Sequence, residues 1–248
     1  MSLRGDSGAI FQRLKPPDDV RLWRYMDFTK YAAMLDSSSL YFARADKFGD
    51  PFEGSLSPIN VKLRETIPLA DKVSGERNMS RTYREMRRWM YINCWHESDY
   101  ESAAMWNQYA RERGAIAIET TAKRLSEQLP EDVLLSRIAY HDYDASAIPE
   151  GNLFFPFLHK RKSFEHEHEV RAIRWKVPPV PNQAALNFAA ENPEEGMAVR
   201  VSLPALIVSV HVSPSAPTWT LDLVGRVTEK YGFAFPVTRS TLDCAPVY

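Results

Sequence analysis

The chain has 248 residues, of which 44% are hydrophobic and 25% charged, and its formal net charge is −1. These values are typical of a globular protein with an ample core, and they give no overall attraction to nucleic acid or to an anionic membrane. Two cysteines, Cys94 and Cys244, are too few for a disulfide framework or a four-cysteine zinc site. No apolar run approaches the roughly 18 residues of a membrane helix, and no signal-peptide core is evident, so we expect a cytoplasmic protein.

The first half of the chain predicts short strands and helices in alternation. Residues 1–19 are polar and contain Pro16-Pro17, which predicts a loose leader. Asp27 is placed to cap a helix at 28–36, and Gly114 to stop one that begins near residue 101. The other elements expected here are strands at 22–25, 40–43, 91–95, 115–119 and 133–140 and a helix at 121–129.

The second half has the same mixed character. A Pro-rich segment, 177–181, predicts an internal linker or turn rather than a domain boundary. The elements expected around it are strands at 169–175, 198–203, 205–212 and 233–237 and a helix at 218–231. We therefore expect residues 20–248 to form a single α+β domain on a mixed, largely antiparallel sheet with helical insertions.

The segment 46–54 has the chemistry of a turn. Gly49 and Gly54 permit positive φ, and a proline follows Asp50 and keeps it extended. Asp50 and Glu53 are thereby placed in one tight loop between two phenylalanines. We interpret this segment as a turn pinned by buried rings, with a ligand-binding loop as the alternative.

The segment 164–169 carries three carboxylates and two imidazoles just before an apolar run. In an extended chain, Glu165, Glu167 and Glu169 would share one face and His166 and His168 the other. Crowded carboxylates bind protons more tightly, or need a cation or a charged ligand opposite them. The alternative is a charged, solvated strand edge.

One predicted helix has a basic face, because four arginines recur along it: Arg77, Arg81, Arg84 and Arg88. Such a stripe can contact the phosphates of a nucleic acid. A solvated helix face explains it equally well and agrees better with the balanced charge of the chain.

Four short sequence motifs, taken in their order along the chain, resemble those of a known family. They are Trp23-Arg24-Tyr25; Ser39 to Phe42 followed by Asp50 to Gly54; Met105 to Ala110 with Gly114; and Glu167 to Arg171. Together they resemble a bacterial family of unknown function, the domain numbered 2971, over about residues 22–175. The chain departs from that pattern at Gly49, where the family usually has Asn, and at Val170, where an aromatic residue is common.

The order of these motifs is also similar, more distantly, to the order of the corresponding elements in ADP-ribosyltransferase folds. That similarity implies NAD as cofactor, with Arg24 holding the dinucleotide, Tyr41 near the nicotinamide, Glu169 stabilising the ribose and Glu167 acting on the acceptor side. The serine-threonine-serine element of many such enzymes is not evident. The full set of candidate site residues is Glu167 and Glu169 as catalytic residues and Arg24, Tyr25, Tyr41, Asp50, Glu53, Trp106 and Arg171 as ligand-binding residues.

Each of these assignments has a structural alternative. Arg24 and Glu169 could form a buried pair between strands, Arg171 and Lys160 to Lys162 could neutralise the carboxylates, and Trp106 could be a core residue. A non-catalytic sensor or interaction module would use the same pocket. A toxin or phage-defence role is an expectation by analogy only.

Two metal-dependent alternatives also remain open at this point. Asp50, Glu53, Glu167 and Glu169 offer oxygen ligands for a magnesium-dependent nuclease, assisted by Lys162. A zinc site would instead draw on Cys94, His96, His166 and His168. Neither set follows a recognised spacing, and we expect no metal. The chain also has no Walker loop, dinucleotide glycine motif or serine-hydrolase elbow.

Overall fold

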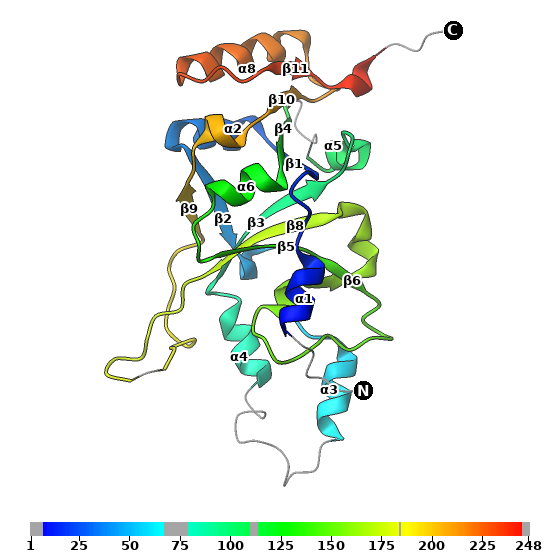
Figure 1. Ribbon diagram of the computed structural model, residues 1–248, viewed down its shortest axis with the longest axis vertical. Coiled ribbons are helices and arrows are strands. Elements are labelled where there is room, and N and C mark those ends of the chain that lie inside the picture. The colour runs from blue at the N-terminus through cyan, green and yellow to red at the C-terminus, as the bar shows by residue number, and fades with distance from the viewer. Residues whose placement is uncertain (1–6, 67–78, 110–113, 184, 245–248) are drawn as a thin grey trace.

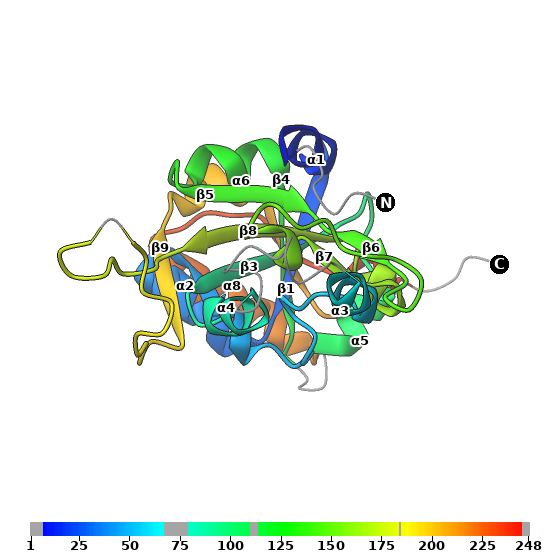
Figure 2. The same ribbon diagram turned by 90° about the horizontal axis from the view of Figure 1, so that it is seen from below.

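The central strand of the sheet, β3 (Met90–Glu97), is buried along almost its whole length. The computed structural model describes residues 7–66, 79–109, 114–183 and 185–244. Within them, β3 pairs antiparallel with β8 (Glu169–Trp175) from one end to the other, and β8 pairs in turn with β5 (Val133–Arg137). Figure 2 shows β5, β8 and β3 in succession. An apolar strand covered on both faces explains why β3 reads as a nearly continuous hydrophobic run.

The other edge of β3 is divided between two strands. Its last residues pair with β1 (Arg21–Met26), through Trp23 and His96, and its first residues pair with β2 (Ser39–Arg44), through Ala43 and Ile92. Asn93–Trp95 lie between these two ladders and are paired only with β8. The sheet therefore forks at the middle of β3.

Each branch of the fork continues into further strands. β1 pairs with β4 (Ile116–Thr121), which pairs with β10 (Ser209–Val212), and β11 (Val237–Arg239) adds to β10 in parallel. β2 pairs with β9 (Gly196–Arg200). A separate parallel pair is made by β6 (Ala139–His141) and β7 (His159–Arg161). The architecture is a single α+β domain on a mostly antiparallel sheet, so the predicted fold class is confirmed.

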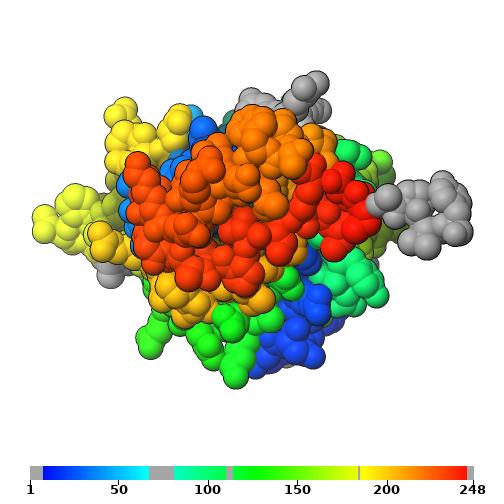
Figure 3. Space-filling model, turned by 90° about the horizontal axis from the view of Figure 1, so that it is seen from above, coloured from blue at the N-terminus to red at the C-terminus, as the bar shows by residue number. Residues whose placement is uncertain are grey.

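The helices build three hydrophobic clusters around the sheet. The largest joins the strands to α2, α6, α7 and α8; the second involves α1 and α4, and the third α5. Figure 1 shows α8 and β11 at the opposite end from α3 and α4, and Figure 3 looks onto the end that α8 covers. The bounds are α1 Ser7–Leu14, α2 Phe28–Ser37, α3 Pro58–Glu65, α4 Met79–Met86, α5 Ala103–Tyr109, α6 Ala122–Gln128, α7 Leu203–Leu206 and α8 Thr218–Lys230. The described residues also include the 3₁₀ segments η1 Ala45–Lys47, η3 Phe155–Phe157, η4 Lys162–Glu167 and η5 Thr241–Asp243.

Most predicted elements occur close to their expected bounds, and the helix caps show why. The Asp27 carboxylate accepts a hydrogen bond from the backbone N–H of Lys30 at the start of α2, as predicted. The predicted strand 133–140 is instead divided between β5 and β6, because the chain leaves β8 at Ile138. Within the range 1–19, expected to be a loose leader, Ser7–Leu14 forms a helix, and Leu14 is buried in the second cluster.

The extended conformation predicted for the Glu/His segment is wrong. Residues 162–167 form η4, and His168 ends it with φ of 38°, in the left-handed region. Because a 3₁₀ turn repeats every three residues, the three glutamates do not share one face. Only Glu169 belongs to a strand, as the first residue of β8.

No helix in the described part of the chain is both long and apolar enough to span a lipid bilayer.

We predict that Gly54→Ala destabilises the fold and that Gly49→Ala does not. Gly54 has φ of 67°, and an added Cβ would collide with the ring of Phe157, whereas nothing lies near a Cβ added at Gly49. The left-handed backbone alone costs a residue with a side chain about 1–2 kcal/mol. Chemical denaturation should show at least this loss of unfolding free energy for Gly54→Ala. Equal stability of the two variants would contradict the prediction.

Candidate functional site

A pocket of about 930 Å³ lies at the fork of the sheet. This volume is within the range usual for small-molecule sites, roughly 300–1,000 Å³. Its walls come from β1, α2, β2, β3, α5, η4, the start of β8 and the loop around Asp50. Seven of the nine candidate site residues line it: Arg24, Tyr25, Tyr41, Asp50, Glu53, Glu167 and Glu169.

Arg24 extends from β1 across the gap between the two branches. One terminal nitrogen donates to the backbone carbonyl of Tyr41 on β2 at 3.3 Å, and the guanidinium lies 5.9 Å from the ring centroid of Trp95. The other terminal nitrogen, Nη1, is buried without a hydrogen-bond partner among the described residues. Burial lowers the pKa of this guanidinium. A buried cation with an unused donor is suited to an anionic group of a ligand.

An alternating row of five charges forms another wall of the pocket. Its order is Glu53, Arg171, Glu169, Lys160 and Glu167, and each neighbouring pair makes a salt bridge. The Arg171 guanidinium donates to both oxygens of Glu169, at 2.7 and 3.0 Å, and to both oxygens of Glu53. Lys160 Nζ lies 3.1 Å from Glu169 and also bonds Glu167. Three carboxylates against two cations leave this charge row with a net charge of −1.

The pKa of Glu169 is lowered and the pKa values of Lys160 and Arg171 are raised, so these three members of the charge row stay ionised at neutral pH. Burial would raise the pKa of Glu169, but Arg171 and Lys160 outweigh it and lower that pKa. Burial likewise opposes the charge on Lys160, yet Glu169 raises the pKa of this amine. The neighbouring Cys94 thiol is buried, which raises its pKa, as does Glu169, with which it makes a hydrogen bond. Cys94 is therefore a protonated donor that helps to fix the Glu169 carboxylate.

The loop around Asp50 closes one side of the pocket through a cation held between aromatic rings. Arg161 donates to Asp50 at 2.8 Å, and its guanidinium lies 4.4 Å from the ring centroid of Phe52 and 5.2 Å from that of Phe164. Asp50 also accepts from the backbone N–H of Phe52, as an Asp-Pro turn does. The segment therefore has the predicted turn, but its rings are not the buried anchors expected, since Phe52 is exposed and Phe48 only half-buried.

Tyrosines supply much of the exposed aromatic surface of the pocket. Tyr41 is 54% exposed, and Tyr109 of α5 stacks on Tyr25 with ring centroids 6.3 Å apart. Burial raises the pKa of Tyr25 and of Tyr109 to about 12, so both phenols are neutral. Tyr109 thus lies at the pocket rather than in the core.

Trp106 and Arg171 are not among the residues that line the pocket. Trp106 is buried, packs edge-on against Tyr25 at 4.9 Å and donates its indole N–H to Glu101. Arg171 is fully buried beneath Glu53 and Glu169. Both fit the structural alternative for them, in which they support residues that face the pocket.

Other residues that line the pocket include Cys94, His96, Lys160 and Arg161. From the sequence, the first two were considered only as zinc ligands and the other two only as groups that neutralise carboxylates. A polar residue inside an otherwise apolar strand is the signal that was available for Cys94 and His96, which interrupt the apolar run of β3. The remaining two belong to the basic triplet before the Glu/His segment. Their pairing with particular carboxylates depends on the turn at η4.

The other charged groups singled out in the sequence lie elsewhere. Glu165, His166 and His168 are exposed, as expected for a solvated edge. In the basic stripe, Arg81 pairs with Glu85 of the same helix, and Arg84 is exposed. Arg77 lies outside the described residues, and Arg88 follows the end of α4.

The carboxylates considered for magnesium are each engaged by a cation. Asp50 bonds Arg161, and the other three belong to the charge row. Among the residues that the structure describes, no group of three or more His, Cys, Asp or Glu side chains is arranged to hold a metal ion.

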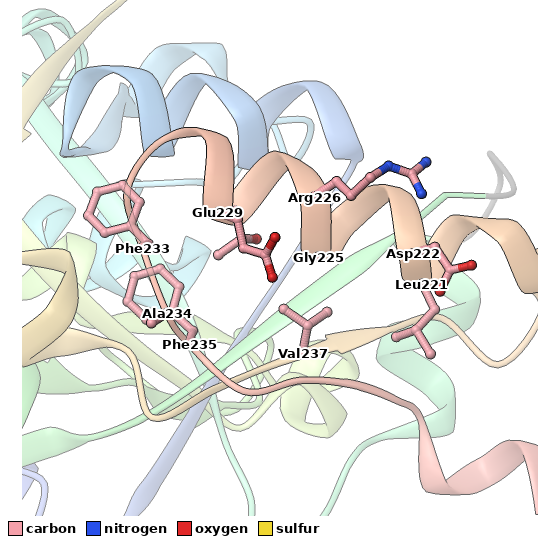
Figure 4. A pocket seen from close by; sticks show the side chains of 10 residues that line it. Leu221, Asp222, Gly225, Arg226, Glu229, Phe233, Ala234, Phe235 and Val237 are labelled. Carbon is pink, nitrogen blue, oxygen red and sulfur yellow. The ribbon is translucent and has the colours of Figure 1, made fainter.

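A second pocket, of about 630 Å³, lies between α8 and the segment that leads into β11. Figure 4 shows the phenylalanines 233 and 235 and Val237 at its base, with Asp222, Arg226 and Glu229 along the helix. It has no buried charge row and no unpaired buried cation. The pocket at the fork is therefore the better candidate for a functional site.

Comparison with known proteins does not change this assignment. No protein-family model matches the chain, and no curated protein matches it. The interpretation of the site consequently depends on its geometry and charges.

We predict that Arg171→Met costs about 3–5 kcal/mol of unfolding free energy, because it leaves Glu53 and Glu169 buried without their partner. Arg174→Met is the matched control on the same strand. Arg174 pairs with the exposed Asp132, so its loss should cost less than about 1 kcal/mol. Denaturant unfolding of both variants measures the difference. A cost for Arg171→Met as small as that of the control would show that the charge row does not stabilise the fold.

Proposed function

We propose that the chain is an NAD-dependent ADP-ribosyltransferase-like enzyme whose active site is the pocket at the fork. The observation that carries the proposal is the convergence of Arg24, Tyr41 and Glu169, from β1, β2 and β8, on this one pocket. The ADP-ribosyltransferase resemblance implies that these three side chains meet in one cleft between two sheets, whereas here the pocket lies between two branches of a single sheet. Residues 145 positions apart in the chain, Arg24 and Glu169, need a functional or a packing reason to face one cavity.

The chemistry required of the site is stabilisation of positive charge. When nicotinamide leaves NAD, its C1′–N bond breaks and positive charge develops on the ribose carbon. A fixed carboxylate in a water-poor site stabilises that charge more in the transition state than in the ground state. Glu169 is 6% exposed and held by Arg171, Lys160 and Cys94, so it needs no reorganisation when the charge appears.

The pairing of Glu169 does not cancel this effect, because the charge row retains a net charge of −1. Glu167 ends the row, is half-buried and lines the pocket, so the excess negative charge is available to the ligand. We assign Glu169 to the ribose and Glu167 to the acceptor side.

The pocket also has a positive charge, on Arg24, which suits the phosphates of the dinucleotide. Arg24 lines the pocket, and we assign the phosphates of the dinucleotide to its guanidinium. Its Nη1 has no partner among the described residues but is closed to solvent, so a bond from this atom to a phosphate requires the side chain to shift. Tyr41 offers an exposed ring on which the nicotinamide can pack. Lys30 also lines the pocket, but its Nζ pairs with Asp27 at 2.9 Å, so we assign the anion to Arg24.

We predict that purified protein releases nicotinamide from NAD and that Glu169→Gln lowers kcat at least about 100-fold, since it removes a charge that acts in the transition state. Glu167→Gln, which is less buried, serves as a second variant if Glu169→Gln fails to fold. Glu165→Gln is the matched control, because Glu165 is exposed in the same segment. Nicotinamide release is followed by chromatography, and folding by circular dichroism.

Absence of nicotinamide release from the wild type, with and without cell extract as acceptor source, would overturn the enzyme proposal. If NAD nevertheless bound in calorimetry, the pocket would be that of a non-catalytic binding module. Magnesium-dependent cleavage of nucleic acid that survived Glu169→Gln would contradict the site assignment.

A separate prediction concerns binding. Arg24→Gln should weaken NAD binding about 10- to 100-fold, because a hydrogen bond to a charged group contributes about 1.5–3 kcal/mol. Lys30→Gln is the control, since its amine is already paired and its loss should change the affinity little. Isothermal titration of NAD into each variant measures both effects. Equal affinities for the two variants would show that Arg24 does not hold the anion.

A further inference from the structure

The structure holds the His96 imidazole in one tautomer, in which one ring nitrogen makes a hydrogen bond and the other makes none with the described residues. It lies in β3, is 3% exposed and lines the pocket. Its Nδ1 is 2.6 Å from the backbone carbonyl of Glu167. A carbonyl only accepts, so Nδ1 carries the proton and Nε2 carries the lone pair.

The unprotonated nitrogen has no competing partner in the described part of the chain. The hydrogen bond at Nδ1 is the one that His96 makes, and Nε2 is not among the buried atoms that lack a partner. Nε2 is therefore accessible, and the surface to which His96 contributes is that of the pocket. The ring is further positioned by edge contacts with Tyr25, at 6.2 Å, and with His168, at 6.1 Å between centroids.

His96 lies next to the two carboxylates that we assign to catalysis, so its Nε2 is placed near the reacting groups. His96 is directly opposite Glu169 in the β3–β8 ladder and bonds the backbone of Glu167. The base and the carboxylate that we assign to the ribose thus arise from one pair of residues on adjacent strands. A nucleophile placed to attack the ribose carbon beside Glu169 lies on the same wall as His96.

We propose that His96 is the general base that removes the proton of the attacking nucleophile, with water as the nucleophile when no acceptor is present; this inference rests on the proposed function. The water oxygen forms a bond to ribose C1′ as the C1′–N bond breaks, and the electron pair of that bond leaves with nicotinamide. The water proton passes to His96 Nε2 and then to solvent. NAD and water give ADP-ribose, nicotinamide and one proton.

The electrostatic surroundings keep His96 in the form that this role needs. Burial lowers its pKa, the bond to the Glu167 carbonyl partly opposes this, and the nearby His168 and His166 lower it further. Glu97, next in the strand, is paired with Arg137, while Glu169 on β8 is ionised and Tyr25 on β1 is neutral. The imidazole is consequently unprotonated at neutral pH, and activity should fall only as the pH drops below about 6.5, the ordinary histidine value.

The test is a pair of substitutions that separate the two ring nitrogens. His96→Asn places an amide N–H where Nδ1–H was and preserves the bond to the Glu167 carbonyl, but it removes the base. His96→Gln places its amide near Nε2 and loses that bond. We expect His96→Asn to lower kcat for NAD hydrolysis about 10²- to 10⁴-fold with little change in KM, the usual range for a general base.

The pH profile and chemical rescue distinguish a base from a packing residue. The fall of kcat/KM at low pH should disappear in His96→Asn and persist in Glu165→Gln, an exposed control in the neighbouring segment. Added imidazole should restore activity to His96→Ala. If the wild type hydrolyses NAD and His96→Asn matches it in rate and pH profile, this inference is overturned and the proposed function stands. If the wild type releases no nicotinamide, both fall.

Discussion

The fork of the sheet at β3 is the constraint on which the rest of the site depends. Where β1 and β2 diverge, the Tyr41 carbonyl has no ladder partner on β3, and side chains replace it: Asn93 donates at 2.8 Å and Arg24 at 3.3 Å. Buried backbone groups must be paired, so this gap accounts for an arginine and an asparagine inside an apolar sheet. The same gap leaves the surface of β3 around Cys94 open as a pocket.

The charge row is the second consequence of the fork. Ionised groups are costly to bury, and here each of the five is matched by at least one opposite charge within hydrogen-bonding distance. A contribution to folding stability does not by itself explain the charge row, because apolar residues of similar volume often stabilise a core as well as buried ion pairs do. Fixed carboxylates that face a pocket are what the proposed reaction, with its developing cation, requires.

The sequence predicted the fold class, most elements and seven residues of the pocket, because these follow from local patterns. In β1, for example, residues alternate between faces, so Arg24 shares a face with Leu22 and Met26, both of which are buried. Neutralisation of the carboxylates by Arg171 and Lys160 to Lys162 was one alternative from the sequence, but the individual pairs were not predicted: Lys160 bonds two glutamates, and Arg161 bonds Asp50. Nor was it predicted that Arg171 lies beneath the pocket rather than in it. The two members of each pair are either distant in the sequence or separated by a turn. Patterns in neighbouring residues therefore do not predict how close their side chains lie.

The wrong prediction of an extended Glu/His segment is the most informative one. The turn found there instead is the conformation that brings the residues of the site together. His168 adopts φ of 38°, which ends η4 and turns the chain into β8. In an extended segment, Glu167 and Glu169 would point the same way and their backbone would continue the ladder. With the turn, the Glu167 carbonyl bonds His96 while its carboxylate bonds Lys160. One residue thereby fixes the tautomer of the proposed base and ends the charge row, so the strained turn connects the two groups that the proposed reaction needs together.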